Sequence, residues 1–250
     1  TCTIWRVYDQ SDHGNHLDPQ TTGSPVGGAG KASQADRERL TVGGYPVYSL
    51  YTRPQESYWH DGSQSGMPLG AEPQGIYMVT SGEHNNGGCC FDYGNGQLSR
   101  VYEGGPTMDS IYFGTSTTWG HGGGSGPWIM ADYEDGMLIY GQSGANPDAV
   151  SWPQKYVTAM ERNNSATFAL KGADATQGTL STIYDGALPS HWRPMKKQGG
   201  VLMGAGGDCC LSNTNMSEGT FYEGAIVAGY PDDATQDAVQ ANIVTAGYGK

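Results

Sequence analysis

Asp132 and Glu134 are two carboxylates separated by a single residue in the run Trp128 to Asp135. If this run is extended, successive side chains alternate between the faces of a sheet, so both carboxylates point one way and Tyr133 points the other way. A like charge nearby raises the pKa of one acid, which can then donate a proton while its neighbour stays ionised. The same spacing is also compatible with a solvated strand end before the turn at Asp135-Gly136.

A third carboxylate, Asp208, follows Gly204-Ala205-Gly206-Gly207, where small residues allow a ligand to approach the backbone closely. Glycoside hydrolysis needs two carboxyl groups that flank the scissile bond. It also needs an apolar platform for the sugar ring, which Trp119 could supply. The carboxylates and this tryptophan together indicate carbohydrate chemistry.

Two pairs of adjacent cysteines, Cys89-Cys90 and Cys209-Cys210, accompany these acids, and the second pair directly follows Asp208. A trans peptide would hold the Cα atoms of an oxidised pair about 3.8 Å apart, below the usual disulfide range of roughly 4.4 to 6.8 Å. Such a ring would be a rigid, apolar wall. Reduced thiols and bridges to distant cysteines remain open, and the odd count of five cysteines leaves at least one, most simply Cys2, without a partner in this chain.

Composition favours an all-β class. The 250 residues include 40 glycines, 16 tyrosines and 6 tryptophans, and only 15% are charged, which is typical of short strands and turns in one sizeable domain. The net charge of −12 argues against nucleic acid or an anionic membrane as a partner, because phosphate binding needs a basic face. No apolar run approaches the length of a membrane span. A neutral ligand such as a sugar suits this chain better.

Short strand-like runs between turn signals predict a β-sandwich. The runs are Thr3 to Tyr8, Tyr45 to Tyr51, Gly75 to Thr80, Ser110 to Phe113, Trp128 to Tyr133, Met137 to Tyr140, Lys155 to Met160, Ala166 to Leu170, Leu180 to Tyr184 and Gly200 to Gly204.

One helix is predicted near the C-terminus, over Asp233 to Ala246. Pro231-Asp232-Asp233 can cap it, Gln236 completes an arrangement like a capping box, and Gly247 stops it. Val239, Ile243 and Ala246 fall at helical spacing and are interpreted as a packing face.

These residues lie in motifs that resemble the catalytic domain of glycoside hydrolase family 54, the fungal-type α-L-arabinofuranosidases B. The resemblance runs over most of the chain. It is carried by Tyr8-Asp9-Gln10-Ser11, Gly14-Asn15-His16-Leu17, Cys89 to Asn95, Ser116 to Gly120, Gly126 to Met130, Gly206-Gly207-Asp208, Gly219 to Gly224 and Gly229-Tyr230-Pro231.

The resemblance implies a concanavalin-like β-sandwich and a retaining enzyme that releases terminal arabinofuranose from arabinan and arabinoxylan side chains. It implies Glu134 as the nucleophile and Asp208 as the acid/base, with no metal or organic cofactor. It assigns Trp119 and Asp132 to holding the furanose ring, with Asp135 and Gly207 beside them in the substrate site. It also implies that Cys89-Cys90 is an oxidised pair that packs against the sugar.

Departures from the family define further expectations. The family has an N-terminal segment, with a cysteine that would pair with Cys2, and a C-terminal arabinose-binding module, and this sequence lacks both. We therefore expect a single catalytic domain over residues 1–250 and a sandwich that is short of strands. The family's asparagine after the nucleophile is here Asp135, whose charge could change substrate choice. A second vicinal disulfide at Cys209-Cys210 is a hypothesis from sequence alone.

Two other functions remain alternatives: a related furanosidase, for example one that acts on galactofuranose, and a non-catalytic carbohydrate-binding sandwich. His13 and His16 are interpreted as structural hydrogen-bonding residues, and Asp92 and Glu223 as supporting residues. The sequons Asn163-Asn164-Ser165 and Asn215-Met216-Ser217 hint at secretion. We expect a secreted monomer that binds a plant cell-wall polysaccharide or oligosaccharide.

Overall fold

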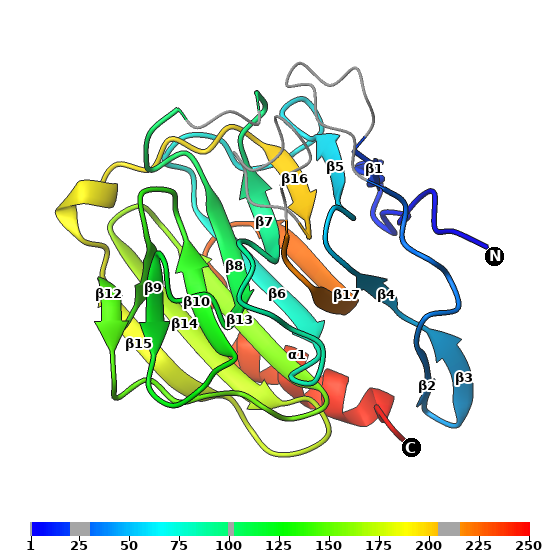
Figure 1. The fold of residues 1–250 in the computed structure, drawn as a ribbon. Coiled ribbons are helices and arrows are strands. Elements are labelled where there is room, and N and C mark those ends of the chain that lie inside the picture. Colours follow the sequence, from blue (N-terminus) through cyan, green and yellow to red (C-terminus); the bar gives the residue numbers. More distant parts are fainter. Residues whose placement is uncertain (1, 21–30, 100–102, 205–215) are drawn as a thin grey trace.

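Two β-sheets pack face to face in the computed structural model, which describes residues 2–20, 31–99, 103–204 and 216–250 (Figure 1). Within these residues the larger sheet has nine strands in the order β1-β5-β16-β7-β8-β10-β11-β12-β9. Their bounds in that order are Asp18–Pro19, Tyr58–Asp61, Gly200–Met203, Asp92–Gly96, Asp109–Gly114, Trp128–Asp132, Met137–Ile139, Gln142–Asn146 and Gly120–Gly122. The predicted β-sandwich is confirmed.

The smaller sheet has six strands in the order β15-β14-β13-β6-β17-β4. Their bounds in that order are Ser181–Ala187, Thr167–Asp174, Val157–Asn163, Gln74–Thr80, Gly219–Ala228 and Leu50–Thr52. A separate hairpin pairs β2 (Arg39–Val42) with β3 (Tyr45–Tyr48), and a short 3-10 helix, η1, spans Ser190–Trp192.

The core between the sheets follows from the alternation of side chains in β10. Ile129 and Ala131 are fully buried among residues from both sheets, and Tyr133, just beyond the strand, meets Phe168 of β14 edge-on at 5.5 Å between ring centroids. The side chain of Asp132 points to the opposite face of the sheet, away from the interior of the sandwich. The alternation predicted for this run holds as far as Tyr133, but β10 ends at Asp132 and Glu134 lies in a turn with φ 68°, where strand alternation no longer applies.

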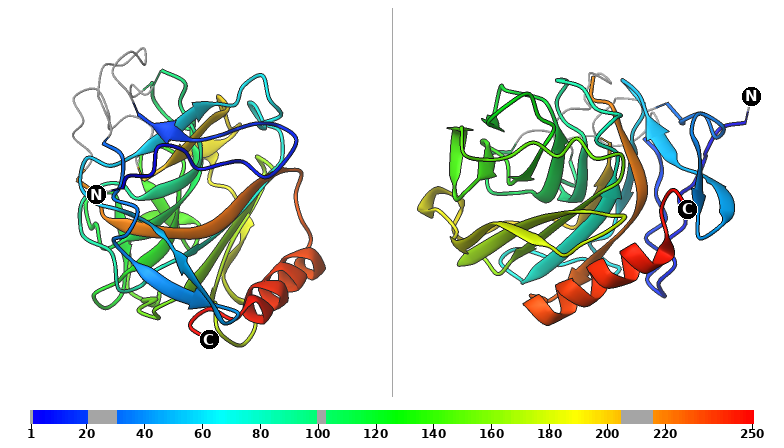
Figure 2. Two further views of the ribbon diagram at one scale, coloured as in Figure 1. Left: turned by 90° about the vertical axis from the view of Figure 1, so that its right-hand side faces the viewer. Right: turned by 90° about the horizontal axis from the view of Figure 1, so that it is seen from below.

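The C-terminal helix α1 (Asp233–Ala246) covers the outer face of the six-stranded sheet, as the view from below in Figure 2 shows. Its predicted bounds are confirmed, and Gly247 ends it in the left-handed conformation with φ 78°. Ile243 is buried and Val239 is half-buried against Val79 and Met160. Among the described residues, no helix is long and apolar enough to cross a membrane.

The predicted capping box is wrong in one detail. Asp232, not Asp233, is the N-cap, and its carboxylate accepts a hydrogen bond from Thr235 N at 2.8 Å. Gln236 instead lies on the buried face of the helix. Counting from the true N-cap puts Thr235 at the third position, so no glutamine is available there to complete the box.

Two strand predictions are corrected by the structure. Thr3 to Tyr8 forms only isolated bridges, at Thr3 with Gln34 and at Val7 with Leu17, because the run meets these partners at single points rather than along a neighbouring strand. Tyr45 to Tyr51 is two strands, β3 and β4, that belong to different sheets. The break falls after Ser49, whose backbone N–H still donates to Glu38 O in the β2–β3 register, whereas Leu50 pairs with Phe221 of β17.

Candidate active site

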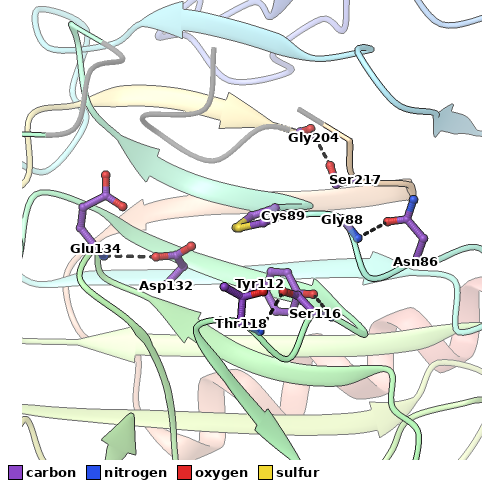
Figure 3. Close-up of a disulfide and its surroundings, with 11 residues drawn as sticks. Asn86, Gly88, Cys89, Tyr112, Ser116, Thr118, Asp132, Glu134, Gly204 and Ser217 are labelled. Carbon is purple, nitrogen blue, oxygen red and sulfur yellow. Dashed lines mark hydrogen bonds between the residues drawn. A yellow bond between two sulfur atoms is a disulfide. The ribbon is translucent and has the colours of Figure 1, made fainter. Parts of the chain in front are cut away.

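The carboxyl end of β10 carries the two acids that the sequence singles out. Asp132 pairs with Ser110 of β8 and with Met137 of β11, and its Oδ1 atom accepts a hydrogen bond from Glu134 N at 3.1 Å. Both residues are buried, with 6% and 7% of their surfaces exposed. Figure 3 shows their side chains on the side of the sheet that carries the Cys89–Cys90 disulfide. The alternative of a solvated strand end is therefore wrong.

The turn after β10 has an uncommon backbone. Glu134 and Asp135 both have positive φ, at 68° and 61°, and Gly136 follows at 129°. A side chain in the left-handed region costs of order 1–3 kcal/mol, and such residues cluster at functional sites. The turn therefore needs contacts from neighbouring segments to hold it.

Three groups from distant segments contact this turn. Trp192 of η1 donates from its Nε1 atom to the Glu134 carbonyl oxygen at 2.7 Å. The Asp135 Oδ2 atom accepts from Gly105 N at 2.9 Å and lies 3.3 Å from His191 Nε2. The resemblance places Asp135 in the substrate site. In the structure its Oδ2 atom already accepts from Gly105 N and lies beside His191.

A disulfide joins Cys89 and Cys90 directly before β7, across a cis peptide bond. The oxidised pair that the resemblance implies is present, and free thiols or distant bridges are excluded for this pair. Cys90 lies close to Asp92 and Asp132, with one sulfur or oxygen atom of each within 4.8 Å of the others. A disulfide sulfur is not a thiolate, so this group offers a metal two carboxylates rather than three ligands.

Asn86 links the disulfide loop to the segment that leads into β17. Its Oδ1 atom accepts from Gly88 N at 2.9 Å (Figure 3). The same oxygen accepts from Glu218 N at 3.1 Å, and the Nδ2 atom donates to Met216 O at 3.0 Å. Ser217 in turn donates to Gly204 O at 3.2 Å. One side chain therefore fixes two segments that are about 130 residues apart in the sequence.

Trp119 lies at the end of a short loop that follows β8. Tyr112 of that strand accepts a hydrogen bond from Ser116 N at 2.8 Å, and Ser116 accepts one from Thr118 N at 3.4 Å (Figure 3). The Trp119 carbonyl accepts from Met137 N, next to the Glu134 turn, and 52% of the residue is exposed. An exposed indole at this edge is available to a ligand.

A buried polar network lies beneath the same turn, on the interior side of the sheet. The Tyr133 hydroxyl donates to Glu161 Oε1 at 2.6 Å, and Lys197 Nζ lies 3.1 Å from Asp109 Oδ2, with both side chains fully buried. Burial, and then the charge of nearby Asp109, raise the pKa of Glu161 well above its usual value. Glu161 therefore holds its proton to a higher pH than an exposed carboxyl group does, and burial also raises the pKa of Asp109, an effect that nearby Lys197 opposes.

The remaining residues that the sequence singled out differ in what the structure shows of them. Gly207, Asp208 and the Cys209-Cys210 pair lie outside the described residues. His16 accepts a hydrogen bond from Asp9 N at 3.1 Å, which confirms its structural interpretation. Asn163 is fully buried in β13 and accepts from Ser165 N at 2.6 Å, so its sequon is not available for glycosylation in the folded protein.

Trp192, His191, Gly105 and Asn86 were not predicted from the sequence. Trp192, His191 and Gly105, which contact the Glu134 turn, lie in the short η1 helix and an irregular segment at least 29 positions away, so no periodic pattern connects them to the turn. The one available signal was the aromatic pair His191-Trp192 between Pro189 and Pro194 in an otherwise polar loop.

Comparison with known proteins identifies the family. The family model described as the catalytic region of α-L-arabinofuranosidase B matches residues 1–249. The chain belongs to this family. A probable α-L-arabinofuranosidase B from Aspergillus clavatus is 42% identical over 254 residues, which cover 99% of this chain and 49% of that protein. The chain thus spans about half the length of the curated relatives it matches.

Solved structures of the family agree with the fold. A glycoside hydrolase family 54 α-L-arabinofuranosidase soaked with a cyclic sulfate inhibitor superposes with a TM-score of 0.93 at 39% identity, over 99% of this chain and 52% of that one. An arabinofuranosidase complexed with arabinofuranosyl-α-1,2-xylobiose superposes with a TM-score of 0.91 at 39% identity and the same coverage. The resemblance to this family found from the sequence motifs is confirmed.

Proposed function

We propose that the chain is a retaining, exo-acting α-L-arabinofuranosidase that releases terminal arabinofuranose from arabinan and arabinoxylan side chains. The observation that carries the proposal is the buried Glu134 carboxylate in a left-handed turn beside Asp132 and the Cys89–Cys90 disulfide. Family membership supports the substrate class, as does the arabinofuranosyl-xylobiose bound by a similar solved structure.

In the proposed mechanism Glu134 attacks the anomeric carbon while Asp208 protonates the departing oxygen. The covalent arabinosyl ester then reacts with a water molecule that Asp208, now ionised, activates as a base. Asp132, Trp119 and the disulfide would hold the ring: the carboxylate accepts from sugar hydroxyls, and the indole and the sulfurs cover an apolar face. Each displacement inverts the configuration of the anomeric carbon, so after two of them the product keeps the configuration of the substrate.

We also propose a secreted enzyme that acts as a monomer. A branched polysaccharide is too large to enter a cell, so its hydrolysis must take place outside. The net charge of −12 suits an uncharged substrate and argues against nucleic acid or anionic membranes as partners.

The first experiment measures release of a chromophore from an aryl α-L-arabinofuranoside, with the aryl β-D-galactofuranoside beside it. We expect turnover of the arabinoside and, by NMR, the α-anomer as the first product. Preference for the galactofuranoside would favour the related furanosidase, and binding without turnover of either would favour a carbohydrate-binding module.

Glu134→Gln tests the nucleophile. We expect kcat to fall by about 10³-fold or more, because the amide cannot form the glycosyl ester. Calorimetry should show that the variant binds an arabinofuranosyl xylo-oligosaccharide with an affinity similar to that of the parent. The matched control is Glu223→Gln on β17, a partly buried carboxylate near Tyr248 in which the same change should leave kcat within about twofold. Parent-like turnover by Glu134→Gln would exclude the assignment.

A further inference from the structure

The positive φ values of Glu134 and Asp135 leave the direction of the Glu134 side chain dependent on outside contacts. The left-handed region is unfavourable for a residue with a Cβ atom, so the isolated turn would relax to other conformations. Relaxation would rotate the Cα–Cβ bond of Glu134 and with it the carboxylate. The contacts on the backbone of this residue therefore decide where its carboxylate lies.

Two side chains bond that backbone: Asp132 Oδ1 accepts from Glu134 N at 3.1 Å, and Trp192 bonds the carbonyl side of the same residue. Its indole N–H donates to the Glu134 carbonyl oxygen at 2.7 Å, and 6% of the residue is exposed, so water competes little for this bond. A Cβ atom added at Gly136 would lie 3.8 Å from Trp192 Cζ2, which shows that the ring also packs along the end of the turn. One side chain thus bonds the Glu134 carbonyl and lies beside Gly136.

Trp192 is itself held in place. It belongs to the main core cluster together with Leu188 and Met195, and its backbone N–H donates to Pro189 O at 3.0 Å. The neighbouring His191 ring lies 3.3 Å from Asp135 Oδ2. The η1 segment is therefore a fixed support against which the turn rests.

We propose that Trp192 is a positioning residue for Glu134: its indole N–H fixes the Glu134 peptide so that the carboxylate is aimed at the anomeric carbon. This rests on the proposed function, in which Glu134 is the nucleophile. Trp192 does not touch the sugar in this scheme, so its loss changes the reactivity of Glu134 and leaves sugar binding in place.

The test measures the reactivity of Glu134 directly, with an α-L-arabinofuranose-configured cyclic sulfate that alkylates a nucleophilic carboxylate. Trp192→Phe removes the indole N–H and keeps an aromatic ring. We expect the first-order rate of inactivation to fall about tenfold, equivalent to about 1.4 kcal/mol of activation free energy, while the half-saturating concentration of the inhibitor changes less than about twofold. Peptide mapping identifies the alkylated residue.

The matched control is Trp128→Phe. Trp128 is also buried, and its Nε1 atom donates to a backbone carbonyl, Gly123 O, at 2.9 Å. It lies at the opposite end of β10 from Asp132, about 13 Å away along an extended strand. We expect a comparable loss of thermal stability in both variants, with the inactivation rate reduced only in Trp192→Phe.

Should Trp192→Phe fail to fold, benzothienylalanine at position 192 keeps the bicyclic shape and lacks only the N–H donor. Equal inactivation rates in the parent and in a folded variant without the donor would overturn the positioning role. A parent that is not alkylated at Glu134 would instead overturn the proposed nucleophile, so the two failures are distinguishable.

Discussion

At the scale of single residues, the acids on the two sides of β10 have opposite roles. Asp132 and Glu134 face the disulfide, whereas Tyr133 between them faces the interior and donates to Glu161. The interior face includes Asp109, Glu161 and Lys197, and burial there raises the pKa of Glu161. The strand thus separates the proposed substrate site from a buried polar network on its other face.

Glu161→Gln tests the proton on Glu161. The raised pKa means that the folded protein keeps a proton that the unfolded chain loses above about pH 4.3. The unfolded state then binds fewer protons, so the parent loses stability as pH rises, by up to about 1.4 kcal/mol per pH unit, until the folded-state pKa is passed. We expect this slope to be smaller in Glu161→Gln, whose Oε1 atom still accepts from Tyr133, and the raised pKa values of Asp109 and Glu223 leave a remainder of the same sign.

Urea unfolding at several pH values between 5 and 8 measures the slope. The control is Glu83→Gln, a carboxylate on the surface, whose stability should follow that of the parent across the range. Parallel curves for the parent and Glu161→Gln would mean that Glu161 is ionised in the folded protein.

At the scale of elements, loops rather than strands carry most of the site. Strand β10 delivers Asp132, but the disulfide lies in the loop before β7, and the Glu134 turn is supported by η1 and by the segment at Gly105. Loops on a rigid scaffold commonly carry function because their side chains can be placed independently.

Asn86→Ala tests the link between the disulfide loop and the segment before β17. The change removes hydrogen bonds to Gly88, Met216 and Glu218, so we expect a loss of about 1–2 kcal/mol in the free energy of unfolding. Because Gly88 directly precedes Cys89, we also expect KM for the aryl arabinoside to rise several-fold with kcat changed less.

Asn85→Ala is the control for that variant, since Asn85 is the adjacent residue and donates only a local bond to Gly82 O at 2.8 Å. Kinetics and urea unfolding of the two variants give the comparison. Identical behaviour of both would show that the disulfide loop keeps its position without Asn86.

The strands that could be predicted from the sequence differ in residue composition from those that could not. Runs such as Gly75 to Thr80 were recognised because β-branched and apolar residues recur between turn signals. Strand β7 is Asp-Tyr-Gly-Asn-Gly and is buried throughout, yet its glycines and polar residues are typical of turns. A Cβ atom at Gly94 would meet Ser110 Cα at 2.6 Å, so contact with β8 requires a glycine that propensity alone assigns to a loop.

The site was predictable in the same uneven way. Alternation along β10 placed Asp132 and Glu134 on one face, and the family motifs pointed to the Cys89–Cys90 disulfide. The left-handed turn and its contact with Trp192 depend on tertiary packing between residues 58 positions apart, which no local pattern encodes.

At the scale of the whole molecule, the two sheets share one hydrophobic core. The face of the nine-stranded sheet that carries the site is opposite the face that packs on the six-stranded sheet, and α1 covers the second sheet from outside (Figure 2). We expect the core side chains to set the spacing of the two sheets, and β10, which leads into the Glu134 turn, belongs to one of them.

Gly172→Ala tests that spacing. Gly172 of β14 faces the other sheet, and an added Cβ atom would lie 2.6 Å from Trp152 Cζ2 and 2.7 Å from Ile129 Cδ1, which is closer than atoms can pack. Pushing these side chains aside should cost about 1–3 kcal/mol, a fall in Tm of about 2–4 °C for each kcal/mol in a chain of this size.

Gly87→Ala is the control, because its Cβ atom would have its nearest contact at 3.6 Å, and replacing glycine where space allows leaves stability unchanged or slightly higher. Calorimetric scans of both variants decide the matter: a parent-like Tm for Gly172→Ala would mean that the sheets can move apart at β14, and the rigid support inferred for the Glu134 turn would then have to come from the loops alone.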